Sequence, residues 1–252
     1  MGIKGEDMNR IIEENAKQLG KKASELISTA IREAIAQKGS ARILLATGAS
    51  QLSTYEELVK EEIEWGKVEM FHLDEYIGLP VTHGASFRKY LKERFVELVH
   101  PKEAYYVNGE GDVAENIRIL TEDLRKAPID VALIGIGENG HIAFNDPPAD
   151  FETDEAYLRV LLDEKCRLQQ VGEGWFTLLK EVPKEAITMS VREIMRSRKI
   201  ISIVPYKVKA AAVRDTLSAD IGPMVPASIL RTHEDWTLLL DADSASLLDQ
   251  DS

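Results

Sequence analysis

The side chains best suited to chemistry lie in one stretch between residues 130 and 148. Its sequence is Asp-Val-Ala-Leu-Ile-Gly-Ile-Gly-Glu-Asn-Gly-His-Ile-Ala-Phe-Asn-Asp-Pro-Pro, in which His141 stands between Asn139 and Asp146. An imidazole titrates near neutral pH, and a neighbouring carboxylate fixes its tautomer. We therefore predict that His141 transfers protons to and from a sugar or carbonyl oxygen, with Asp146 as its carboxylate partner. The alternative is a histidine that only bonds to the backbone of its own loop.

The glycines of this stretch also match a dinucleotide-binding turn. Gly135, Gly137 and Gly140 have the required spacing, and Asp163 follows at about the distance of the acidic residue that binds a ribose. A dinucleotide site needs a long helix directly after the turn, because the helix N-terminus holds the pyrophosphate. The Pro147-Pro148 pair stops any such helix within two turns. The glycines are therefore predicted to let a small substrate approach the backbone.

A second candidate for acid-base chemistry is Asp74, directly after the apolar run 68–73. A carboxylate at the carboxyl end of a strand faces the crevice of an open sheet. Partial burial and the like charge of Glu75 would raise its pKa toward that of a base for a carbon acid. The alternative is that Asp74 caps a turn and Glu75 is solvated.

Two further features suit an anion. The first is a turn that leads into a helix and could offer backbone amides and two hydroxyls, formed by Thr47, Gly48, Ala49 and Ser50. The second is the pair Lys207 and Lys209, which opens a helix, an unfavourable place for cations unless an anion is bound nearby. An ordinary strand-to-helix turn and a solvated lysine pair are the alternatives.

Strands and helices alternate along the chain. Apolar residues at steps of three and four predict a helix from Ile12 to a stop at Gly39, and Ser86 caps a helix with Phe87, Leu91, Phe95 and Leu98 on its inner face. Strands are expected at 41–46, 68–73, 131–134, 158–162, 186–189, 200–204 and 236–240, and further helices at 51–64, 111–126 and 207–217. This order predicts an α/β fold with a Rossmann-like, open, mostly parallel sheet and helices on both faces, in a single domain over residues 1–252.

Composition narrows the function classes. The chain has 252 residues and a net charge of −12, which opposes binding to nucleic acid or to anionic membranes. The single cysteine, Cys166, allows neither an internal disulfide nor a cysteine metal cluster, and His with Asp at this spacing matches no metal-ligand pattern, so no metal is expected. Without an apolar signal segment or membrane span, the expected compartment is the cytoplasm.

The assembled motifs resemble the glucosamine-6-phosphate deaminases over nearly the whole chain. Related 6-phosphogluconolactonases share the glycine turn and histidine, but they lack the Asp-Glu-Tyr block and continue differently after the histidine. The residues that carry the resemblance are Leu45-Ala-Thr-Gly48, the block 71–80, the block 135–147, Lys209 and Pro226-Ala-Ser-Ile-Leu230.

The resemblance implies a cofactor-independent conversion of an amino-sugar 6-phosphate into a ketose 6-phosphate and ammonia. It implies that Asp74 takes the proton from C2 and returns it at C1, and that His141, oriented by Asp146, opens the sugar ring. The turn at residues 47–50, the glycine turn at Gly137 and Lys209 would hold the substrate, with the phosphate against the first and last of these.

The chain departs from the best-studied members of this family in several places. Asn139 replaces an aspartate and Asp146 a glutamate, so the histidine faces one carboxylate instead of two. A phosphate-binding arginine has no counterpart in Leu-Gln-Gln-Val-Gly-Glu-Gly-Trp-Phe at 168–176, where Arg167 or the two glutamines are the candidate substitutes. The basic residues of the allosteric site are unmatched around 150–162, so allosteric activation is not expected.

Three functions stay open at the level of sequence. The leading one is the deaminase, for glucosamine 6-phosphate or its galacto epimer. The second is lactone hydrolysis, in which Asp74 has no carbon proton to remove. The third is a non-enzymatic sugar-phosphate sensor, for which no helix-turn-helix segment or basic patch is evident. Family members occur as monomers and as hexamers, so a homo-oligomer also stays open.

Overall fold

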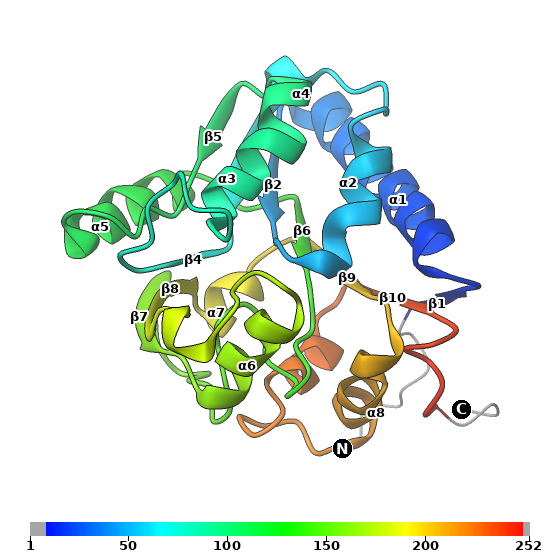
Figure 1. The fold of residues 1–252 in the computed structure, drawn as a ribbon. Coiled ribbons are helices and arrows are strands. Elements are labelled where there is room, and N and C mark those ends of the chain that lie inside the picture. Colours follow the sequence, from blue (N-terminus) through cyan, green and yellow to red (C-terminus); the bar gives the residue numbers. More distant parts are fainter. Residues whose placement is uncertain (1–8, 249–252) are drawn as a thin grey trace.

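A seven-stranded parallel sheet forms the centre of the protein (Figure 1). The computed structural model describes residues 9–248. The strand order is β1-β10-β9-β6-β2-β3-β5, and every neighbouring pair is parallel. The predicted open α/β fold is thereby confirmed. The strands are β1 Asn9–Glu13, β2 Ala41–Leu45, β3 Val68–His72, β5 Glu103–Tyr105, β6 Val131–Ile134, β9 Lys199–Val204 and β10 Trp236–Asp241.

A second, antiparallel sheet of three strands stands beside the first, in the order β4-β8-β7. Its strands are β4 Asp74–Tyr76, β7 Tyr157–Leu161 and β8 Glu185–Met189. The two runs predicted at 158–162 and 186–189 are therefore strands, but they do not join the parallel sheet. Only Leu73 separates β3 from β4, so the chain passes from one sheet to the other at Asp74, which pairs with Thr188 of β8.

Helices cover both faces of the parallel sheet, and its strands are therefore buried on both sides. Along β2, Ile43 and Leu45 face the cluster that contains α1, α2 and α3, and Leu44 faces the cluster that contains α5, α7 and α8. Figure 1 shows α1 and α2 on the opposite side of β9 and β10 from α8. The helices are α1 Ala16–Lys38, α2 Leu52–Leu58, α3 Phe87–Leu91, α4 Glu97–Val99, α5 Val113–Leu124, α6 Glu164–Gly172, α7 Val191–Ile194 and α8 Ala210–Ser218.

The first predicted helix was placed too early. The side chain of Asn15 accepts hydrogen bonds from the amides of Lys17 and Gln18, so α1 begins at Ala16, and Gly39 ends it in the left-handed region as predicted. Ile12 instead belongs to β1 and pairs with Leu240 of β10. Apolar spacing could not separate β1 from α1, because Ile12 lies four residues before Ala16 and so fits the helical spacing.

The inner face predicted for the helix after Ser86 was wrong at its last residue, Leu98. Ser86 accepts a hydrogen bond from the amide of Lys89, as expected for a cap. Residues Lys92–Val96 form a π-helical turn, which inserts one residue into the helical repeat. As a result Val99 is 7% exposed, whereas Leu98 is 58% exposed.

The remaining differences are short elements. The helix predicted at 51–64 ends at Leu58, and β4, β5, α6 and α7 were not predicted. Asp163, which had matched the ribose-binding position of a dinucleotide site, is the N-cap of α6. Within residues 9–248, no helix combines the length and the apolar character needed to cross a bilayer.

Candidate active site

One cavity collects most of the predicted site residues at the carboxyl ends of the parallel strands. The turn after β2, the start of β4 after β3, the glycine turn after β6 and the helix after β9 all reach it. Open parallel sheets bind their ligands at this edge. The predicted residues that line the cavity are Thr47, Gly48, Ser50, Asp74, Gly137, His141 and Lys209.

Three predicted residues lie outside the cavity wall. Ala49 opens a 3-10 turn, Ala49–Gln51, that continues into α2. Asn139 and Asp146 lie behind the histidine and contact it there. They belong to its support and not to the surface that a substrate would touch.

Asp74 is buried at the wall of the cavity, with 6% of its surface exposed. Burial raises its pKa well above the ordinary value, and the neighbouring charge of Glu75 adds to the rise. A carboxyl with a raised pKa is a stronger base once it loses its proton. The environment of Asp74 therefore suits the removal of a proton from carbon.

Glu75 is fully buried, which contradicts the alternative of a solvated side chain. Alternate residues of a strand point to opposite faces, so Glu75 turns away from the side that Asp74 takes. Its carboxylate accepts hydrogen bonds from the hydroxyl of Ser86 and from the amides at the start of α3, and it pairs with Arg88 at 3.3 Å. Glu75 thus fixes α3 against β4, while burial raises its pKa despite these bonds.

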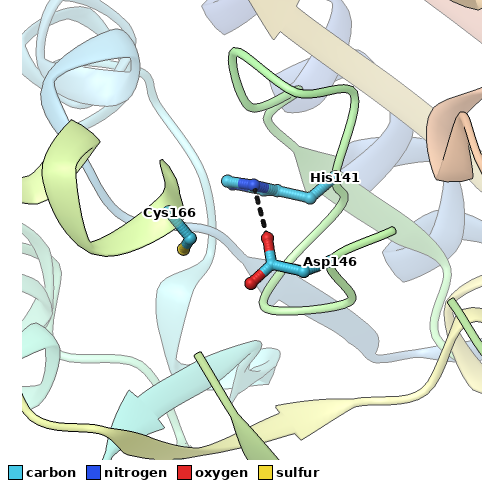
Figure 2. Close-up of side chains that lie close together, drawn as sticks. All are labelled: His141, Asp146 and Cys166. Atoms are coloured by element: carbon cyan, nitrogen blue, oxygen red, sulfur yellow. Dashed lines mark ion pairs between the residues drawn. The ribbon is translucent and has the colours of Figure 1, made fainter. Parts of the chain in front are cut away.

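His141 is held from one side by Asp146 (Figure 2). Its Nδ1 lies 3.1 Å from Oδ1 of Asp146, and the two side chains face each other across the loop. Asn139 links them: its Oδ1 accepts a bond from the His141 amide, and its Nδ2 donates to Asp146, each at 3.1 Å. Burial alone would raise the pKa of Asp146, but the contacts with His141 and Asn139 lower it below the usual value. Asp146 is therefore a carboxylate that fixes the orientation of the imidazole.

The glycine turn brings the histidine ring close to the backbone. The amide of Gly137 donates to the carbonyl of His141 at 2.9 Å, which closes the turn. A Cβ atom at position 137 would lie 2.2 Å from ring atoms of His141. No helix follows this turn before α6, and a dinucleotide would lack its helix N-terminus here.

Gly137→Ala is expected to lower kcat/KM by about 10- to 100-fold, because the added methyl displaces the His141 ring from its place beside Asp146. The backbone at Gly137 is not left-handed, so alanine is otherwise tolerated there. Steady-state kinetics with a melting curve test this. Gly172→Ala is the matched control, since a Cβ at Gly172 meets nothing within 4 Å. Unchanged kinetics in Gly137→Ala would show that the ring position is not limiting.

Lys209 lines the same cavity as the turn at residues 47–50. It is 5% exposed, whereas Lys207 is exposed, so only one of the two predicted lysines faces the cavity. Burial lowers the pKa of Lys209, and the nearby charge of Glu173 opposes that effect. Gly48 has φ of 104°, a conformation that favours glycine, and it turns the chain so that Thr47 and Ser50 both reach the cavity.

Three cavity residues come from α6 and its end. Gln169 and Gln170 line the wall, in agreement with one of the two substitutes considered for the missing arginine. Arg167 does not reach the cavity, because its guanidinium donates to the carbonyls of Leu179 and Val182. Glu173 also lines the cavity and was not predicted. The signal that could have revealed it was the polar segment 168–174, but this was not recognised as a helix.

A buried thiol completes the surroundings of the histidine. Donor atoms of His141, Asp146 and Cys166 lie within 4.8 Å of one another, close enough to consider a metal (Figure 2). A thiol binds metals as the thiolate. Burial and the charges of Asp146 and Asp163 raise the pKa of Cys166, so its thiol is protonated beside the carboxylate. Nδ1 of His141 faces Asp146, and the protonated thiol lies beside this pair, so the three residues together surround and support the imidazole.

The chain matches known proteins over nearly its whole length. Residues 14–239 match the model of the family described as glucosamine-6-phosphate isomerases/6-phosphogluconolactonase. A glucosamine-6-phosphate deaminase of Thermoanaerobacter sp. (strain X514) is 35% identical, over 96% of this chain and 95% of its own. One of Bacillus pumilus (strain SAFR-032) is 36% identical, over 95% of this chain and all of its own.

Solved structures show the same likeness. A monomeric glucosamine-6-phosphate deaminase superposes with a TM-score of 0.87 at 31% identity, covering 95% of this chain and 100% of that chain. A 6-phosphogluconolactonase of Thermotoga maritima superposes with a TM-score of 0.78, covering 93% of this chain and 100% of that one, but its 17% identity shows only a shared fold. The chain therefore belongs to the family of glucosamine-6-phosphate isomerases and 6-phosphogluconolactonases.

Proposed function

We propose that the protein converts glucosamine 6-phosphate and water into fructose 6-phosphate and ammonia without a cofactor or metal. The observation that carries the proposal is the placement of Asp74 and His141 in the wall of one cavity, the first with a raised pKa and the second paired with a carboxylate. Deaminase relatives that match nearly the whole chain support the same activity. The single cysteine, buried and free, suits a reducing compartment, and we place the reaction in the cytoplasm.

His141 acts first in the proposed reaction. Asp146 occupies Nδ1, which leaves Nε2 to the substrate. His141 moves a proton from the C1 hydroxyl to the ring oxygen, so the ring opens and C1 becomes an aldehyde. The aldehyde acidifies the proton on C2, which carries the amino group. Ring opening therefore prepares the substrate for a carboxylate base.

Asp74 then transfers the C2 proton to C1. The ionised carboxylate removes the proton from C2 while the amino group, in its ammonium form, gives a proton to the aldehyde oxygen, which forms an enolamine. The proton held by Asp74 then returns to C1 and gives an iminium at C2. Water adds to C2 and ammonia leaves, which balances the reaction. The Thr47–Ser50 turn and Lys209 hold the phosphate at the other end of the cavity and so fix the distance between Asp74 and C2.

Turnover of three substrates tests the proposal. The purified protein is incubated separately with glucosamine 6-phosphate, galactosamine 6-phosphate and 6-phosphogluconolactone, while ammonia and acid release are followed. We expect ammonia from glucosamine 6-phosphate. Ammonia from the galacto epimer alone would change the substrate, acid from the lactone alone would make the protein a lactonase, and phosphate-sugar binding without turnover would make it a sensor.

A further inference from the structure

A carboxylate faces the proposed phosphate subsite, where an anionic substrate would have to bind. Glu173 follows α6 and lines the same cavity as Thr47, Gly48 and Lys209. Its Oε1 is 3.9 Å from Nζ of Lys209. A Cβ atom built on Gly48 would lie 3.9 Å from its Oε2. The carboxylate therefore lies close to both the lysine and the turn, the two elements proposed to hold the phosphate.

The position of this carboxylate is fixed by its own segment. Gln169 donates to Oε1 at 2.7 Å, and the indole nitrogen of Trp175 donates to Oε2 at 3.1 Å. Both donors are neutral, and neither depends on Lys209. The side chain of Glu173 is 20% exposed, whereas that of Lys209 is 6% exposed, so the pair is partly shielded from solvent. Shielded charges interact more strongly than charges in bulk water.

We propose that Glu173 is a built-in counter-ion of the phosphate subsite, which compensates Lys209 in the free protein and sets a weak affinity for the sugar phosphate. The inference rests on the proposed function, because it assigns the phosphate to this end of the cavity. A dianion that reaches Lys209 must also approach the Glu173 carboxylate or displace it from its two donors. The attraction of the lysine is thereby offset, and the KM for the sugar phosphate is raised while the distant chemistry at Asp74 is not changed.

Glu173→Gln tests the counter-ion with a side chain of nearly the same shape. Inorganic phosphate is the probe, and its dissociation constant is measured by titration calorimetry. We expect phosphate to bind about tenfold more tightly to Glu173→Gln than to the natural protein, and KM to fall similarly with kcat unchanged. Phosphate binding to the variant should also weaken more steeply with added salt, because an uncompensated lysine is screened. Glu138→Gln is the matched control, since Glu138 is exposed and does not line the cavity, and its removal takes the same charge from the protein.

A double-mutant cycle with Lys209→Met separates charge compensation from a change in shape. In the Lys209→Met background, the gain in phosphate affinity from Glu173→Gln should differ from the gain in the natural protein, because the two side chains act on one subsite. Weaker phosphate binding in Glu173→Gln, or an unchanged phosphate affinity and an unchanged KM, would overturn the proposed role of Glu173 as a counter-ion. Because phosphate binding needs no turnover, these outcomes are distinct from a failure to release ammonia, which would defeat the proposed function alone.

Discussion

Asp74→Asn is expected to lower kcat by about 10²- to 10⁴-fold and, at the same time, to make the protein more stable at neutral pH. The amide cannot accept the C2 proton, which explains the loss of turnover. The gain in stability follows from burial. The folded state holds the Asp74 proton more tightly than the unfolded chain does, because its pKa is raised. This carboxyl therefore stabilises the fold at low pH, and that contribution is lost as the pH rises through the raised pKa.

Melting curves and kinetics together test this expectation. Above the raised pKa of Asp74 the variant should melt at a higher temperature than the natural protein, by about 2–4 °C for each kcal/mol gained, whereas in acid the two should converge. Asp220→Asn, at an exposed aspartate, should change neither quantity. A variant that is inactive because it is unfolded would show the opposite shift in melting temperature, and full activity in Asp74→Asn would remove the proposed base.

The pH profile of the natural protein gives a second check on Asp74. Only the ionised carboxylate removes a proton, so kcat/KM should decline as the pH falls through the raised pKa. The decline should occur at a higher pH than for an ordinary aspartate, since burial and Glu75 both raise this pKa. A decline of kcat/KM at the pKa of an ordinary aspartate would mean that the surroundings of Asp74 become more polar when the substrate enters.

The sequence predicted contacts best where the residues in contact lie close together along the chain. The segment from Gly135 to Asp146 forms its turn, its histidine and its carboxylate within one loop, so the pairing of His141 with Asp146 could be predicted from their proximity. Asp74 could be predicted for a related reason. Its place directly after a strand puts it at the edge where parallel strands end, whatever the strand order is.

Other features depend on long-range packing and could not be predicted in the same way. Glu75 looks like an exposed acidic residue in the sequence, but helix α3 returns to bury it and its amides satisfy the charge. Glu173 enters the cavity only because α6 ends beside Lys209, and no spacing along the chain relates these two residues. The antiparallel pairing of β7 with β8 was missed because alternation of strands and helices favours a parallel sheet.

His141→Gln is expected to lower kcat by about 10³-fold, because glutamine keeps polarity at the site but cannot carry a proton to the ring oxygen. Substrate deuterated at C2 distinguishes this role from that of Asp74. If His141 opens the ring, its loss makes ring opening slow, and the deuterium isotope effect on kcat/KM falls toward one. In a slow variant of the base, Asp74→Glu, the isotope effect should instead rise.

The control for the histidine is His83→Gln. His83 is exposed and stacks on Phe176, but it does not line the cavity, so turnover and isotope effect should match those of the natural protein. An isotope effect that stays large in His141→Gln would place the histidine in the C2 proton transfer and not in ring opening. The support from Asp146 would then stabilise an imidazolium during carbanion formation, and the carboxyls of Asp74 and Asp146 would serve one step instead of two.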